Sequence, residues 1–144
     1  MKRLALVTVF ACVVAQAIPR YTAEACRAKG KVGEVVKLEV AYLNARRDGG
    51  KDVKEGYVFM EAYTYDGNQH GGSIEVAIPE AAVDYYVKRA GIKTRYRGHR
   101  YKVRTYEARG TIRTMEMEHR DGEVMYVELD LPKSLKKKRR KLGE

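Results

Sequence analysis

The sequence contains very little cysteine, since its 144 residues include only Cys12 and Cys26. Cys12 lies in an apolar N-terminal segment that we expect to be removed, so the mature chain would retain Cys26 alone. No intramolecular disulfide is then available, and the fold must be held together by a hydrophobic core. Cys26 is predicted to be either a buried free thiol or a link between two chains.

Residues with catalytic chemistry are also scarce. The three histidines, His70, His99 and His119, do not have the spacing of a metal site such as H-x-x-x-H. The only two serines, Ser73 and Ser134, lack the sequence context of a nucleophile elbow, and there is no glycine-rich phosphate-binding loop. The sequence therefore predicts a protein that is not an enzyme and that binds no metal and no cofactor.

The first seventeen residues have the order of a secretory signal peptide. Lys2-Arg3 supplies positive charge, residues 4–14 are almost wholly apolar, and Ala15-Gln16-Ala17 places small residues at a cleavage site. The apolar run is shorter than the roughly 20 residues that a membrane-spanning helix needs. A membrane anchor, a buried strand or a lipoprotein acylated at Cys12 are the alternatives. We expect cleavage after Ala17 and a secreted or periplasmic protein.

Positive charge is concentrated at the C-terminus. Of the formal net charge of +10, residues 133–144 carry +6, and residues 18–132 carry only +2. Length and charge predict a lead-in at 18–31, one domain at 32–132 and a disordered basic tail at 133–144. The tail cations of interest are Lys136, Lys137, Lys138, Arg139, Arg140 and Lys141.

Alternation of apolar and polar residues predicts five strands. A rather long loop beginning at Asp66-Gly67-Asn68 should join the second strand to the third. Near Thr105 the alternation changes parity, which indicates a bend in the fourth strand. The predicted strands cover Val36–Tyr42, Tyr57–Tyr65, Ser73–Ile78, Arg100–Met117 and Glu123–Asp130.

Two helices are predicted, a short one at Ala23–Ala28 and a longer one at Glu80–Ala90. The longer helix follows Pro79 and carries apolar residues at helical spacing. Its apolar stripe consists of Val83, Tyr86, Val87 and Ala90. We expect Val87 to be buried together with the strand residues Val40, Met60 and Val76.

This order of strands and helices resembles the OB-fold, a small five-stranded barrel. The resemblance covers roughly residues 32–130 and rests on strand order, helix position and Gly110 in the fourth strand, without a specific motif. It implies a mainly β, five-stranded OB-like barrel with one helix between strands 3 and 4. It also implies a ligand face on the second and third strands, flanked by loops at Asn44–Glu55 and His119–Gly122.

Three groups of residues are candidates for ligand binding. The first is an aromatic strip, Tyr57, Phe59, Tyr63 and Tyr65, with Arg46 and Arg47 in the neighbouring loop. The second is a basic strand face formed by Arg100, Lys102 and Arg104, and the third is the basic tail. Exposed aromatic rings stack on bases, but the same residues are ordinary strand formers, and reversed faces would make Phe59 part of the core.

These features predict an exported, non-catalytic binding module for an anionic polymer. Single-stranded nucleic acid is the first candidate, followed by a glycan or an envelope polymer, and the tail could contact a membrane surface. The alternative is an envelope accessory or protein-interaction module whose basic tail only holds it to an anionic surface. An exposed aromatic strip would favour the first hypothesis, and a buried strip would favour the second.

Overall fold

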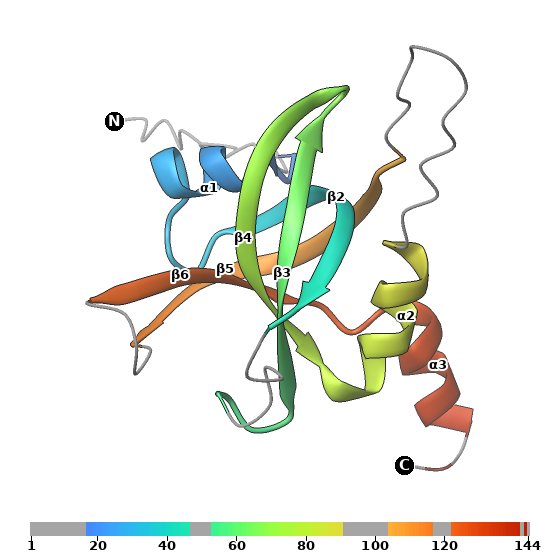
Figure 1. The fold of residues 1–144 in the computed structure, drawn as a ribbon. Coiled ribbons are helices and arrows are strands. Elements are labelled where there is room, and N and C mark those ends of the chain that lie inside the picture. The colour runs from blue at the N-terminus through green and yellow to red at the C-terminus, as the bar shows by residue number, and fades with distance from the viewer. Residues whose placement is uncertain (1–16, 47–52, 91–103, 117–121, 142, 144) are drawn as a thin grey trace, which may run out of the picture.

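The computed structural model describes residues 17–46, 53–90, 104–116, 122–141 and 143, with residues 138–141 placed by their backbone alone (Figure 1). Five strands form a closed barrel in the order β2-β3-β4-β6-β5, because β5 also pairs with β2. They are β2 (Val35–Ala45), β3 (Tyr57–Asp66), β4 (Gln69–Pro79), β5 (Tyr106–Glu116) and β6 (Glu123–Leu129). This mainly β, closed five-stranded barrel confirms the predicted fold class and is compatible with an OB-like fold.

Neighbouring barrel strands are antiparallel except for β4 and β6, which pair in parallel. A two-residue strand, β1 (Arg20–Tyr21), adds in parallel to β2. Because β1 precedes the barrel, helix α2 (Val83–Arg89) lies between β4 and β5 rather than between strands 3 and 4 as predicted. Within the barrel, β4 and β5 are the third and fourth strands. The helix therefore has its predicted place in the barrel, and only the strand numbering changes, because β1 was not predicted.

Helix α1 (Ala23–Lys29) confirms the short helix expected in the lead-in, because the sequence supplies both of its ends. The Thr22 hydroxyl oxygen accepts a hydrogen bond from the Ala25 N–H at 3.1 Å, as an N-cap residue does. At the other end, the Gly30 N–H donates to the Cys26 carbonyl. Cys26 is a buried free cysteine, and burial raises the pKa of its thiol to about 11.

The barrel interior is filled by the strand residues that alternation places inward. Val40, Met60 and Val76 are buried in one cluster, as predicted. Residues of α1 and α2 join this cluster, so both helices pack on the barrel. The other strand residues in it are Val36, Leu38, Ala62, Ile74, Ile78, Ala108, Ile112, Val127 and Leu129.

The helical segment after β4 begins as the 3-10 turn η1 (Glu80–Ala82) and continues as α2. Its buried residues are Ala82, Tyr86 and Ala90, which recur every four positions on one face. Val87 follows Tyr86 by one position, which turns it away from that face, and it is 42% exposed. The prediction that Val87 joins the core is therefore wrong.

The hairpin between β3 and β4 is tighter than predicted. β4 begins at Gln69 instead of Ser73, and Asp66 pairs with Gln69 across a turn in which Gly67 has a φ of +59°. Gly71 is therefore a strand residue and not a loop residue. A Cβ atom at Gly71 would lie 2.5 Å from the Thr22 side chain, so glycine here allows the start of α1 to approach β4 closely.

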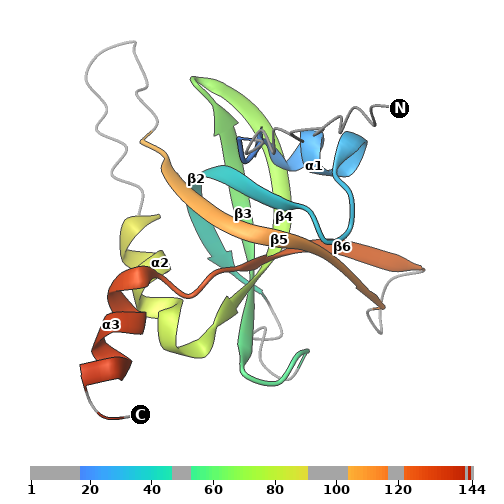
Figure 2. The same ribbon diagram turned by 180° about the vertical axis from the view of Figure 1, so that it is seen from behind.

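The segment predicted to be a disordered tail forms helix α3 (Lys133–Lys141), which lies beside α2 (Figures 1 and 2). The Pro132 carbonyl accepts the Leu135 N–H in the first turn. Leu131 and Leu135 pack against the main core cluster, so the start of the charged segment contacts the barrel. Within the described residues, no helix is long and apolar enough to cross a membrane.

Candidate functional site

Phe59, at the centre of the predicted aromatic strip, is fully buried, which contradicts its expected exposure. It belongs to a second, smaller cluster with Ala77 and Tyr126, and its ring centre lies 5.2 Å from that of Tyr126. Val53, from the segment that precedes β3, packs against this cluster. The outer side of the sheet is therefore covered at Phe59 and offers no ring there to a base.

The Tyr57 side chain is hydrogen-bonded to the carboxylate of Glu128. Its hydroxyl donates to Glu128 Oε1 at 3.0 Å, and Lys54 Nζ donates to Glu128 Oε2 at 2.7 Å. The Lys54 ammonium also lies 4.7 Å from the centre of the Tyr57 ring. Arg113 Nε adds a third charge at 3.6 Å from Glu128. This network holds the segment that precedes β3 against the barrel wall.

The network predicts a pH-dependent contribution of Glu128 to stability. Burial raises the pKa of Glu128, but hydrogen bonds from Lys54 and Tyr57 outweigh it, so that its pKa is lowered overall. A carboxyl with a lowered folded-state pKa stabilises the fold above its ordinary pKa of roughly 4.3. That stabilisation is lost as the pH falls through the folded-state pKa.

We therefore expect Glu128→Gln to lower the free energy of unfolding by about 1 kcal/mol near neutral pH, with a smaller deficit in acid. Denaturant melts from about pH 7 to about pH 2 measure this difference. Glu116→Gln, at the exposed end of β5, is the control and should follow the wild type. A deficit that stays constant across the range would show that Glu128 acts by packing and not by charge.

Tyr63 and Tyr65 are half-buried beside Tyr42 and His70, which are not among the predicted site residues. Tyr63 stacks on Tyr42 of β2, with ring centres 4.2 Å apart and planes 15° apart. The edge of Tyr65 meets His70, with centres 5.1 Å apart. A register shift in β2 brings Tyr42 opposite Tyr63. Cross-strand aromatic contacts stabilise the sheet, and here they occupy one face of the Tyr63 ring.

The predicted barrel cations have different surroundings. Arg46 Nη1 lies 3.7 Å from Glu75 Oε2, and the two side chains are only 21% and 11% exposed. The Arg46 charge is therefore compensated within the barrel wall. Arg104 is exposed just before β5. Arg47, Arg100 and Lys102 lie outside the described residues.

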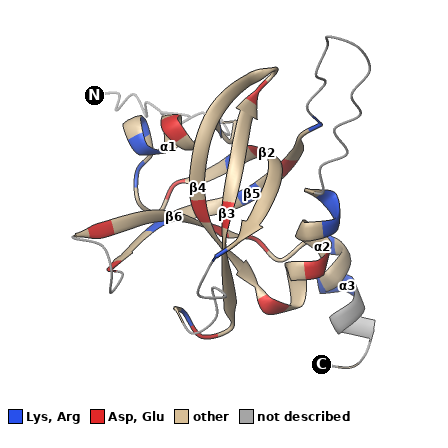
Figure 3. Cartoon of the chain, viewed as in Figure 1, with Lys and Arg blue, Asp and Glu red and all other residues tan. Residues whose placement is uncertain are grey.

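Exposed cations lie at the end of α2 and along the start of α3, while Asp84 in the first turn of α2 is also exposed (Figure 3). The last turn of α2 supplies two of them, and the first two turns of α3 supply three. We call this group the helical cationic surface; it consists of Lys88, Arg89, Lys133, Lys136 and Lys137, all exposed. Of the predicted tail cations, Lys136 and Lys137 belong to it. The side chains of Lys138, Arg139, Arg140 and Lys141 are not described.

Local contacts hold the two helices in this arrangement. The Tyr86 hydroxyl of α2 donates to the Asp130 carbonyl, in the segment that leads from β6 to α3. Burial raises the pKa of Tyr86, so this hydroxyl stays protonated and continues to donate. The Arg89 guanidinium lies 3.5 Å from the centre of the Tyr85 ring. Tyr86 thus anchors α2 to the segment before α3, and the Tyr85 ring orients the Arg89 side chain of the helical cationic surface.

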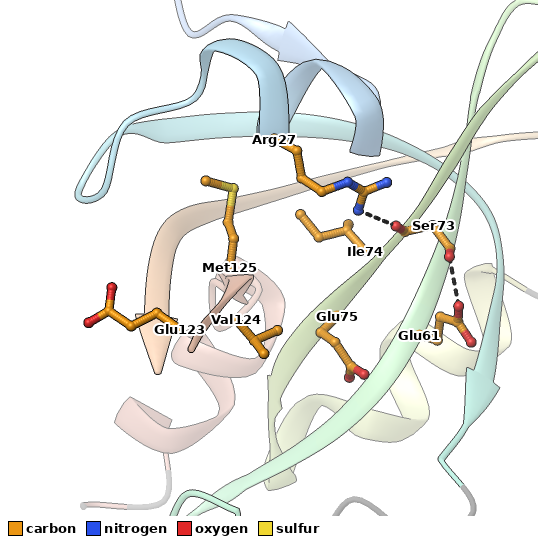
Figure 4. Close-up of a pocket in the computed structure, with 8 residues that line it drawn as sticks. All are labelled: Arg27, Glu61, Ser73, Ile74, Glu75, Glu123, Val124 and Met125. Carbon is orange, nitrogen blue, oxygen red and sulfur yellow. Dashed lines mark hydrogen bonds between the residues drawn. The ribbon is translucent and has the colours of Figure 1, made fainter. Parts of the chain in front are cut away.

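Two surface cavities have acidic linings. The first, of about 470 Å³, lies where β4 and β6 diverge beneath α1 (Figure 4). Its lining includes Glu61, Glu75 and Glu123, with Arg27 as the one cation among the lining residues. The second, of about 570 Å³, is lined by Glu80, Glu128 and Asp130 among others. Glu75, Glu128 and Asp130 are ion-paired with cations outside the linings, but the linings themselves hold more acidic than basic side chains, which disfavours an anionic ligand.

The described residues contain no group of three or more His, Cys, Asp or Glu side chains that could hold a metal ion. Comparisons with protein-family models, curated proteins and solved structures find no match to this chain.

Proposed function

We propose that this protein is a non-catalytic interaction module that attaches to an anionic polymer or surface through its helical cationic surface. The observation that supports this is the clustering of exposed cations on α2 and α3, while both cavities are acidic. The aromatic strip favours an interaction module over a barrel-face nucleic-acid binder, because Phe59 is buried and Tyr57 is bonded to Glu128.

The proposed contact differs from the usual ligand face of an OB-like barrel, which is the outer side of its second and third strands. Cations on two helices neutralise phosphate, sulfate or carboxylate groups without reading a base sequence. Attachment should therefore depend strongly on salt and weakly on the identity of the polymer. Single-stranded nucleic acid fits this description as one polyanion among several.

We also propose that residues 1–17 are a signal peptide and that the protein acts outside the cytoplasm. The Lys37 N–H donates to the Pro19 carbonyl at 2.9 Å and β1 pairs with β2 from Arg20, so described backbone bonds of the fold lie just after the proposed cleavage site. Cleavage after Ala17 would leave those bonds intact. N-terminal sequencing of exported protein should begin at Ile18, and recovery of uncleaved protein from the cytoplasm of its host would contradict export.

Neutralising two cations of α3 should reduce the salt dependence of polyanion binding. The slope of log affinity against log salt is negative, and we expect Lys136→Gln with Lys137→Gln to make it shallower by about 1.4 for oligo-dT. Each lost phosphate contact accounts for roughly 0.7 of this change. Fluorescence anisotropy of a labelled oligonucleotide measures this slope. Polyphosphate should compete, because charge alone is recognised.

The matched control is Lys29→Gln with Lys31→Gln, which removes the same charge from exposed positions at the end of α1 and just beyond it. This variant should keep the wild-type slope. If the slope becomes shallower by the same amount in both variants, net charge and not the helical cationic surface determines binding. If the full chain binds neither polymer at low salt, the attachment proposal fails.

A further inference from the structure

β4 and β6 diverge toward their N-terminal ends and leave a fork in the barrel wall. They pair only where Glu75–Ala77 meets Tyr126–Glu128, although β4 begins at Gln69 and β6 at Glu123. Beyond the paired residues, β4 continues beside β3 while β6 continues beside β5 (Figure 1). Each strand therefore has an edge in the fork that no described barrel strand pairs. The cavity of about 470 Å³ occupies this fork (Figure 4).

The β4 edge of the fork carries an outward-facing backbone acceptor. Arg27, an exposed residue of α1, donates from Nη1 to the Ser73 carbonyl oxygen at 2.6 Å. A donor on α1 can reach this oxygen only because the carbonyl points out of the sheet edge (Figure 4). A side chain therefore occupies the position that the N–H of a neighbouring strand would take. Because α1 lies against β4 at Gly71 and Gly72, the edge within the fork is the short stretch at Ser73 and Ile74. Strand edges that no other strand pairs accept added strands.

Charge complementarity selects the kind of strand that fits. The carboxylates of Glu61 and Glu123 line the fork on either side, and Ser73 Oγ donates to Glu61 Oε1 at 2.6 Å. An acidic segment would be repelled by these groups, whereas a lysine or arginine side chain would be attracted. Its methylene groups would lie on the apolar part of the lining, which consists of Ile74, Val124 and Met125.

We propose that the fork binds an extended basic segment of a partner protein as an added strand. A backbone N–H of the segment takes the place of the Arg27 guanidinium at the Ser73 carbonyl of β4, and a lysine or arginine side chain lies between Glu61 and Glu123. The proposal rests on the proposed function and names a partner for the interaction module. The fork and α3 lie on opposite sides of the molecule in both views (Figures 1 and 2), so the partner and a polyanion can bind together.

The test uses the full chain and a labelled peptide of alternating valine and lysine as the probe. We expect saturable binding, weakened about tenfold by Glu61→Gln with Glu123→Gln, because two charge-assisted contacts become neutral. Glu123→Gln alone, at an exposed position, should weaken binding less while leaving the fold unchanged. Arg27→Ala should tighten binding, because its guanidinium competes with the peptide for the Ser73 carbonyl.

Two peptide controls and one protein control separate this proposal from simple charge attraction. A valine–glutamate peptide, and a valine–lysine peptide with alternate backbone nitrogens methylated, should both bind much more weakly. Lys136→Gln with Lys137→Gln should leave peptide binding unchanged, so a failure of polyanion attachment does not affect this result. Equal binding of the methylated peptide would overturn strand addition, and insensitivity to the two glutamate substitutions would overturn the site.

Discussion

Phe59→Ala should lower the free energy of unfolding by about 3–5 kcal/mol, which makes it one of the most damaging truncations in the barrel. The Phe59 side chain is fully buried between Ala77, Tyr126 and Val53 on the outer side of the sheet. Truncation removes apolar burial and the contact with the Tyr126 ring, and it leaves a cavity that β-strands cannot easily close. Equilibrium denaturation in urea measures the loss.

Tyr63→Ala is the matched control, because it truncates another ring on the same face of β3. Tyr63 is only half-buried, so we expect this substitution to cost about 1–2 kcal/mol, mostly from the stack on Tyr42. The stability loss of Phe59→Leu should lie between those of Phe59→Ala and Tyr63→Ala. If Phe59→Ala were as mild as Tyr63→Ala, Phe59 would be exposed in solution and the aromatic strip would again be a candidate ligand face.

Gly110→Ala should also destabilise the barrel, by about 1–3 kcal/mol or more. Gly110 pairs with Val36 of β2 and with Leu129 of β6, so it lies where β5 is held by strands on both sides. A Cβ atom there would lie 2.5 Å from the Glu128 carbonyl oxygen and 2.7 Å from Val127 Cγ1. The backbone atom cannot move unless β5 and β6 separate.

Thermal melts of the full chain measure the Gly110→Ala effect. Because the obstruction is backbone, Gly110→Ser should be at least as harmful as Gly110→Ala, even though serine is polar and small. A melting temperature that is unchanged in both variants would mean that β5 and β6 do not approach this closely. The pairing of β5 with β6 at Gly110 would then be wrong.

Much of the fold follows from local sequence patterns. Alternation at Val36, Leu38 and Val40 predicts an inward row on β2, and the structure buries all three. Pro79 marks the end of β4, and the helix that follows has the expected position along the chain. Period-2 and period-3.6 patterns report which face of one element is apolar. That information is sufficient for the strand order to be proposed and for most of the core to be named.

The candidate site depends on contacts that local patterns do not contain. The Tyr57–Glu128 hydrogen bond joins residues 71 positions apart, and Val53 covers Phe59 from a segment that reads as a loop. Both faces of β3 are therefore buried at one point, whereas alternation assumes a single buried face. The charge of residues 133–144 predicts a disordered tail and does not indicate helix α3. Leu135 of α3 and Leu131, which precedes the helix, pack against the core, and this long-range contact is not visible in the charge pattern.

An NMR titration of the full chain with oligo-dT at low salt can locate the polyanion contact residue by residue. Such a titration shows directly whether polyanions contact the helical cationic surface. We expect the largest backbone amide shifts in α2 and α3, small shifts in β3 from Tyr57 to Tyr65, and reversal by added salt. Largest shifts on the outer face of β3, or no shifts in α2 and α3 at low salt, would contradict this contact.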